Sequence, residues 1–227
     1  MKKFGYFKTS DPQLPGIRFG NWGSRPYEYM WAAFVEPVEG LDVIDFGTGL
    51  PSEHNWHEFV RDNLKPKSYL GFDFDSRIKN EEINTPNHKV LWMDASNLQM
   101  PDNSIDLVYA ISTFEHIDNF DLFKKILKEM HRVLRPGGKM VITLDEYWDH
   151  YDQSCLPWNE LERARNRAGL KTEDQNTSYG MTDFTLDAFD LFEPCDAVVM
   201  KQNADKSLLY SPVYNDCVSY GVFKVRK

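Results

Sequence analysis

Short apolar runs alternate with amphipathic segments along this chain. The runs predict strands at 41–46, 68–72, 89–93, 105–110 and 139–144. Apolar residues at helical spacing predict helices over 53–64 and 119–134, and another helix that Ser24-Arg25-Pro26 opens and Pro37 closes. Strands that alternate with helices indicate an α/β fold, with a mostly parallel sheet and helices on both faces.

The first predicted strand ends in a distinctive loop, Asp45-Phe-Gly47-Thr48-Gly49, with a helix expected to begin near Pro51-Ser52. Open α/β sheets bind ligands at this edge. A carboxylate there would repel a pyrophosphate, but it suits a ligand that carries an ammonium and a sulfonium. Ser52 also occupies the place where a dinucleotide site needs its third glycine. The loop therefore favours S-adenosylmethionine over NAD.

Composition and charge limit the size of the fold, the partners and the cellular compartment that we expect. The 227 residues allow one large domain, and 41% apolar residues can fill its core. The net charge of −9 disfavours a nucleic-acid partner. No segment is apolar enough for a membrane span, the first ten residues lack the apolar region of a signal peptide, and three scattered cysteines argue against a disulfide framework. We expect a cytoplasmic enzyme.

Four motifs in order resemble the class I S-adenosylmethionine-dependent methyltransferases, of the broad small-molecule type often called methyltransferase type 11. After the glycine loop come Tyr-Leu-Gly-Phe-Asp73, Trp-Met-Asp94-Ala-Ser-Asn-Leu, the segment from Pro101 to Ser112, and His-Arg-Val-Leu-Arg-Pro-Gly-Gly-Lys. The resemblance covers residues 41–145. It implies a Rossmann-like, seven-stranded sheet with an antiparallel last strand, for which 197–201 and 218–225 are suitable sixth and seventh strands.

The resemblance also implies a division of the chain within one methyltransferase domain, 1–227. Residues 1–36 would form an arm and helix over the cofactor, and 41–145 the cofactor-binding core. Residues 146–190 would be a substrate-side insert, and 195–227 the C-terminal strands. The sequence leaves the oligomeric state open.

The cofactor-binding residues follow from the matched motifs. Asp45 would hold the methionine end of S-adenosylmethionine, although a strand-end acid can also simply cap a loop. Asp73 would accept hydrogen bonds from the ribose hydroxyls, and Asp75 is the other candidate for this role. Asp94 would accept a hydrogen bond from the adenine amino group. Arg25 could pair with the methionine carboxylate, or lie in solvent at a helix start. The expected set is completed by Gly47, Thr48, Gly49, Phe74, Ala95 and Ser112, the last of which could instead be a core hydroxyl.

The segment after the fourth strand constrains the acceptor. Ser112-Thr-Phe-Glu115-His116 differs from the Asn/Asp-Pro-Pro-aromatic signature of enzymes that methylate nucleic-acid amino groups, and no cysteine lies near for a covalent mechanism. Oxygen, nitrogen or activated carbon acceptors remain. A hydroxyl needs a base, and His116 is the first candidate, followed by Glu115 and Asp145. Asp145, Glu146 and Asp149 could ligate a metal, but their spacing does not require one.

Aromatic residues gather in two segments outside the matched core, 4–36 and 146–182. Such residues can stack on sugar rings, although in surface loops they more often close a lid. The run from Trp22 to Trp31 is similar to openings of methyltransferases in bacterial surface-glycan pathways, which favours a small-molecule or sugar/glycan hydroxyl and a role in glycan biosynthesis. Two alternatives are a methyltransferase-like binding protein without turnover and a nicotinamide-dependent oxidoreductase.

Overall fold

A computed structural model describes residues 14, 16–18, 25–117, 119–147, 191–200 and 216–225. At residues 26–27, 115, 120, 144–147, 192–200 and 216–225 it describes the backbone alone. The α-helices are α1 (Arg25–Val35), α2 (Trp56–Phe59) and α3 (Phe120–Val133). A π-helical turn at Val60–Leu64 extends α2, and 3₁₀ turns lie at Ser76–Asn80 and Phe114–His116.

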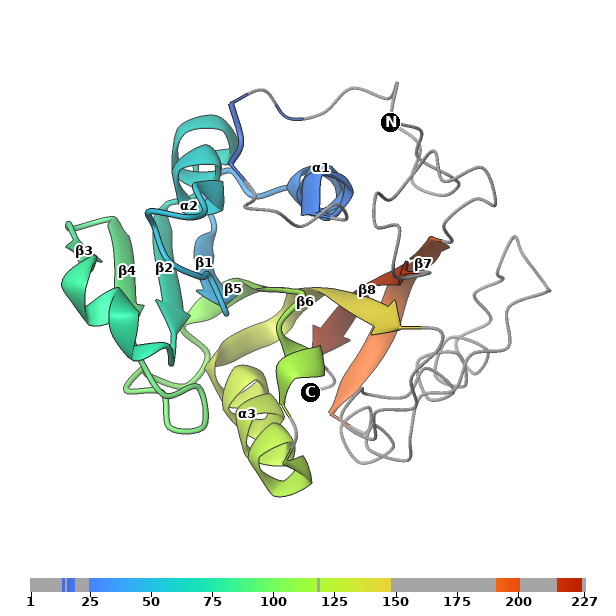
Figure 1. The fold of residues 1–227 in the computed structure, drawn as a ribbon. Coiled ribbons are helices and arrows are strands. Elements are labelled where there is room, and N and C mark those ends of the chain that lie inside the picture. Colours follow the sequence, from blue (N-terminus) through green and yellow to red (C-terminus); the bar gives the residue numbers. More distant parts are fainter. Residues whose placement is uncertain are drawn as a thin grey trace.

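One twisted sheet organises the molecule (Figure 1). Its spatial order is β3-β4-β2-β1-β5-β6-β8-β7. The central strands are parallel, whereas β8 pairs antiparallel with both β6 and β7, which confirms the antiparallel last strand. The sheet also includes a two-residue edge strand, β3, which the sequence does not predict. The strands are β1 (Asp42–Phe46), β2 (Ser68–Asp73), β3 (Ile83–Asn84), β4 (His88–Trp92), β5 (Ile105–Ile111), β6 (Leu134–Tyr147), β7 (Phe192–Met200) and β8 (Asp216–Val225).

Each face of the sheet has its own apolar core, because successive residues of a strand point to opposite sides. α1 and α2 cover one face and α3 the other (Figure 1). In β1, Val43 packs in the core under α1 and α2, and Ile44 and Phe46 pack in the core over α3. Asp45 shares the face of Val43, so its carboxylate points toward α1 and α2 rather than toward α3.

The helix after β1 begins later than the sequence predicts. The expected start near Pro51-Ser52 is wrong, since residues 51–53 form a turn and α2 starts at Trp56. The carbonyl of Leu50 accepts hydrogen bonds from the amides of Glu53 and His54, which closes the chain into a turn there. The Asn55 side chain then bonds to the carbonyl of Gly16 and the amide of Arg18 rather than capping the helix.

Aromatic rings fix α1 and α2 over the strands. The rings of Tyr29 and Trp56 stack with centroids 4.7 Å apart and planes 4° from parallel, and Trp56 also stacks on Phe59. Tyr109 of β5 meets Trp56 edge to face. Such pairs add to the stability that burial alone provides. In the part of the chain that the structure describes, no helix has the length and apolarity that crossing a bilayer requires.

Candidate functional site

The carboxyl end of β1 holds a buried carboxylate. Asp45 is 1% exposed, and its Oδ2 accepts a hydrogen bond of 2.6 Å from the Tyr69 hydroxyl. The same hydroxyl lies 3.2 Å from Oγ1 of Thr48. Burial raises the pKa of Asp45 to about 7 against these favourable hydrogen bonds. The site therefore keeps an acid whose charge a cationic ligand would stabilise.

Two glycines turn the chain away from Asp45. Gly47 has φ of 74°, and a Cβ there would lie 2.2 Å from Oγ1 of Thr113, so only glycine fits. Gly49 has φ of 71°, and its amide donates to Oδ2 of Asp73 over 3.1 Å. The loop thus joins the carboxyl ends of β1 and β2 and leaves room for a ligand against its backbone.

A pocket of about 170 Å³ opens beside this loop. It lies at the carboxyl ends of β1 and β5, under the start of α1, and brings together predicted cofactor residues with the predicted base. Its lining consists of Arg25, Tyr29, Asp45, Gly47, Thr48, Gly49, His54, Trp56, Ile111 and His116.

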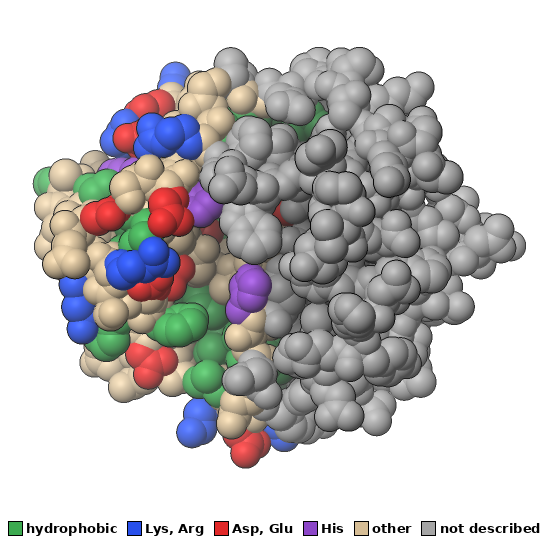
Figure 2. Space-filling model, in the orientation of Figure 1, with side chains coloured by type: hydrophobic (Ala, Val, Ile, Leu, Met, Phe, Trp, Pro, Cys, Tyr) green, Lys and Arg blue, Asp and Glu red, His purple; other side chains and the backbone are tan. Residues whose placement is uncertain are grey.

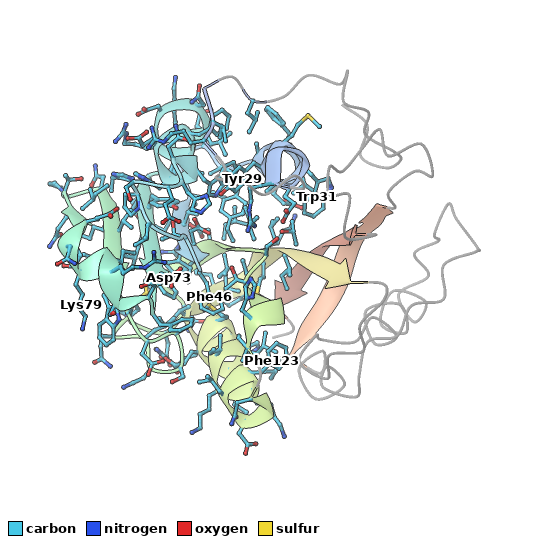
Figure 3. The ribbon with its side chains drawn as sticks, viewed as in Figure 1. Tyr29, Trp31, Phe46, Asp73, Lys79 and Phe123 are labelled. Atoms are coloured by element: carbon cyan, nitrogen blue, oxygen red, sulfur yellow. The ribbon has the colours of Figure 1, made fainter. Side chains whose placement is uncertain are left out.

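Asp73 lies at the end of β2, in the left half of Figure 3, with both carboxylate oxygens engaged. Oδ2 accepts from Gly49, and Oδ1 accepts from the amide of Asp75 over 2.9 Å. Asp75 itself caps the following 3₁₀ turn and pairs with Arg77 over 2.7 Å. Asp73 therefore faces the glycine loop, while its competitor Asp75 is bound to an arginine.

An exposed aromatic edge continues from Asp73. Phe74 is 70% exposed, and its carbonyl accepts a hydrogen bond from Nε1 of Trp92 over 3.0 Å. Nζ of Lys79 lies 3.8 Å above the Trp92 ring. Asp94 follows on the exposed loop after β4, where its Oδ1 accepts from the amide of Ser96. Ala95 beside it is buried.

Arg25 and Ser112 meet at a carboxylate that the sequence does not single out. Glu28 is fully buried, and its Oε2 accepts from Nη1 of Arg25 at 3.4 Å, from the Ser112 hydroxyl at 2.5 Å and from the Thr143 hydroxyl. Arg25 also donates to the carbonyl of Ile111 over 3.1 Å. Arg25 is thus a buried member of the pocket rather than a solvated helix start, whereas Ser112 lies beside the pocket without lining it.

The predicted bases differ in how much of each the structure describes. His116 lines the pocket, where loss of hydration lowers its pKa and the positive charge of Arg25 lowers it further. The side chains of Glu115 and Asp145 lie outside the described residues, as do Glu146 and Asp149 as ligands of a metal. Among the described side chains, no three potential ligands gather in a metal-binding group.

The aromatic residues expected to contact an acceptor also fall largely outside the description. Of the N-terminal segment, Tyr29 lines the pocket. The side chain of Tyr27 is not described, and Phe4, Tyr6, Phe7, Phe19 and Trp22 lie outside the described residues. So do the predicted substrate-side residues beyond position 147.

Sequence reasoning missed three residues of the site. Tyr69 bonds to Asp45, His54 lines the pocket beside Gly49, and Glu28 holds Arg25. A polar residue at i+3 from Arg25 within an apolar helix was a usable signal for Glu28. Tyr69 lies two residues before Gly71, which pairs with Asp45, so strand alternation places it on the face of Asp45.

Comparison with known proteins agrees with this geometry. Residues 44–142 match the family model described as a methyltransferase domain. The matched range contains the glycine loop, Asp73, Asp94 and His116. The segment 44–142 is therefore similar to a methyltransferase domain, in agreement with the resemblance to class I S-adenosylmethionine-dependent methyltransferases.

Curated relatives of this domain include proteins named for a sterol and for a fatty acid. A probable S-adenosylmethionine-dependent methyltransferase of Mycolicibacterium smegmatis is 25% identical over 80% of this chain and 68% of its own length. The sterol 24-C-methyltransferase erg6 of Aspergillus fumigatus is 28% identical over 73% of this chain. A fatty-acid O-methyltransferase of M. smegmatis is 30% identical over 65% of it. This chain spans 44% and 50% of the last two proteins.

Solved structures share the fold. A geranyl diphosphate methyltransferase in complex with S-adenosylmethionine superposes with a TM-score of 0.56. The match covers 89% of this chain and 86% of that one, at 12% identity. At that identity the likeness concerns the arrangement of strands and helices alone.

Proposed function

We propose that the protein transfers the methyl group of S-adenosylmethionine to a hydroxyl of a small-molecule or sugar acceptor. The observation that carries the proposal is the pocket in which Arg25, Asp45 and the Gly47–Gly49 backbone converge. Together they offer a cation, an anion and a close backbone approach. Those groups are complementary to the carboxylate, the ammonium and the chain of a methionine moiety.

The other cofactor residues extend from this pocket along the ends of the strands. Asp73 accepts hydrogen bonds from the ribose hydroxyls, since its Oδ2 faces the glycine loop and can accept a further bond beside that from the Gly49 amide. Phe74, with its ring largely exposed, offers a face to the adenine. Asp94 accepts the adenine amino group, and the Ala95 amide donates to the ring. A nicotinamide dinucleotide fits less well, because Asp45 would oppose its pyrophosphate.

The reaction depends first on the positioning of the two reactants. Methyl transfer is a displacement at an activated sulfonium, and holding the two reactants in line supplies on the order of 7–11 kcal/mol. A hydroxyl acceptor also has to lose its proton as the new bond forms. His116 serves as the base: its lowered pKa keeps the imidazole neutral at neutral pH, when it can accept that proton.

The class of acceptor and the atom that is methylated form a separate part of the proposal. The aromatic residues of segments 4–36 and 146–182 favour a ring-shaped acceptor such as a sugar. The named relatives include an oxygen and a carbon methyltransferase, so the acceptor atom has to be measured. A panel of sugars, fatty acids, quinols and sterols, with detection of labelled methyl product, tests the acceptor class. Methylation at carbon or nitrogen in these acceptors, with none at a hydroxyl oxygen, would contradict the proposal.

The base is tested by His116→Asn. We expect kcat to fall by about 10²–10⁴-fold with nearly unchanged S-adenosylhomocysteine affinity, because only proton transfer is lost. The wild-type rate should also fall as pH drops through the histidine's titration. Near-normal kcat with a flat profile between about pH 5.5 and 8, the range that spans an ordinary histidine pKa, would assign the role to Glu115 or Asp145, or to no base.

A further inference from the structure

Glu28 ties three elements together by one oxygen atom. Its Oε2 receives a hydrogen bond from Arg25 on its own helix, another from Ser112 after β5 and another from Thr143 in β6. The side chain is fully buried. A buried carboxylate persists where several donors compensate its lost hydration. Oε1 has no hydrogen-bond partner among the described residues, so Oε2 carries these contacts.

The side chains bonded to Glu28 reach the pocket region from two sides. On one side Arg25 lines the pocket, and Glu28 together with the Ile111 carbonyl sets the direction of its guanidinium. On the other side Ser112 adopts φ of 44°, a conformation that non-glycine residues rarely take, and its amide bonds to Thr143. His116 follows this turn by four residues. Displacement of Glu28 would therefore disturb both the arginine and the segment that carries the base.

We infer that Glu28 is a positioning residue for methyl transfer, which presents Arg25 to the carboxylate of the cofactor and fixes the turn at Ser112. The inference rests on the proposed function. Glu28 does not line the pocket, so it acts through Arg25 and Ser112 and not by touching the ligand. A carboxylate suits this place because its oxygen accepts from a guanidinium and two hydroxyls at once.

The test compares two ligands in Glu28→Gln. S-adenosylhomocysteine has the amino-acid carboxylate, whereas 5′-methylthioadenosine lacks the whole amino-acid portion but keeps the adenosine. We expect the variant to bind S-adenosylhomocysteine roughly tenfold more weakly, as befits a weakened charge-assisted hydrogen bond. Binding of 5′-methylthioadenosine should stay within about twofold of wild type, since its contacts do not involve Arg25. Calorimetry measures both.

Controls separate positioning from general loss of structure. Glu36→Gln removes a carboxylate just beyond the end of α1, whose Oε2 accepts a hydrogen bond of 2.6 Å from Nζ of Lys139. This change should alter neither affinity. Arg25→Ala should produce the same split between the ligands, and the double variant should lose little more than either single one. If Glu28→Gln does not fold, Thr143→Val removes one donor to the same oxygen and should produce a smaller split.

Three outcomes would overturn the inference: equal losses for both ligands, an unchanged affinity for S-adenosylhomocysteine, or additive losses in the double variant. Failure of the proposed function looks different. In that case wild-type protein does not bind S-adenosylhomocysteine, whatever residue stands at position 28.

Discussion

Asp45 combines a buried position with a predicted role in cofactor binding. The hydroxyl groups of Tyr69 and Thr48 lie beside its carboxylate, and the residue is 1% exposed. Burial raises its pKa to about 7, so the folded protein holds a proton there more tightly than the unfolded chain, where the ordinary value is 3.8. The stability that Asp45 contributes is therefore lost as pH rises from about 4 to 7. The protein thus loses some stability at neutral pH because it keeps a buried carboxyl group that can pair with a cationic ligand.

Asp45→Asn tests this trade between stability and binding. The amide accepts the Tyr69 hydrogen bond without a charge, so we expect the ligand-free variant to melt above wild type at pH 8 and to lose most of that advantage at pH 4. S-adenosylhomocysteine should bind it more weakly, because the ammonium loses its counter-ion. Melting curves at the two pH values measure the first effect. A difference in melting temperature that does not change with pH would contradict it.

Asp73 should hold the ribose, and Asp75 should not. Asp73→Ala removes a charged acceptor, so S-adenosylhomocysteine affinity should fall by about 1.5–3 kcal/mol. Asp75→Ala is the matched control: it breaks a bond to Arg77 on an exposed 3₁₀ turn and should change affinity little. Calorimetry on both variants decides between the two carboxylates. A loss in Asp75→Ala alone would reverse the assignment.

At the scale of elements, α2 docks on β4 through two buried imidazoles. Nδ1 of His57 lies 3.1 Å from Nε2 of His88, and the two rings stack. Burial lowers the pKa of His57 to about 4, and the neighbouring His88 contributes to the same shift. Unfolded histidine titrates near 6.5, so below that pH the unfolded chain binds the extra proton.

We therefore expect the stability that His57 contributes to fall as pH drops from about 6.5 to 4, opposite to the trend of Asp45, by up to about 1.4 kcal/mol per pH unit for one proton. His57→Phe keeps an aromatic ring against His88 without titrating, so its stability should fall less over the same range. Urea unfolding at pH 7, 5.5 and 4.5 compares them. Parallel pH dependences in the two proteins would remove His57 from this account.

Elements with strong local signals were predictable from the sequence. The helix predicted at 119–134 is α3, because its apolar residues recur at helical spacing and the Asn119 side chain caps it at Leu122. The start of α2 was not, because Asn55 binds residues 16 and 18, far back in the chain. The same reason hid Glu28, whose partners Ser112 and Thr143 lie 84 and 115 residues away. Spacing reveals a strand end, but not which distant side chain meets it.

Over the whole molecule, the sheet gathers distant segments at one edge. The pocket draws residues from α1, from the ends of β1 and β5 and from the turn before α2. On the face shown in Figure 2, acidic and basic side chains are intermixed over the described part of the surface. A ligand in the pocket would link α1 to the sheet, so saturating cofactor should raise the melting temperature by mass action.

Calorimetric titration with S-adenosylhomocysteine is the most direct test of whether this edge of the sheet binds S-adenosylmethionine. We expect one site per chain with a Kd in the micromolar range or tighter, about −8 kcal/mol or better. NAD titrated under the same conditions should give no binding heat. Binding of NAD without binding of S-adenosylhomocysteine, or of neither ligand to folded protein, would contradict the account.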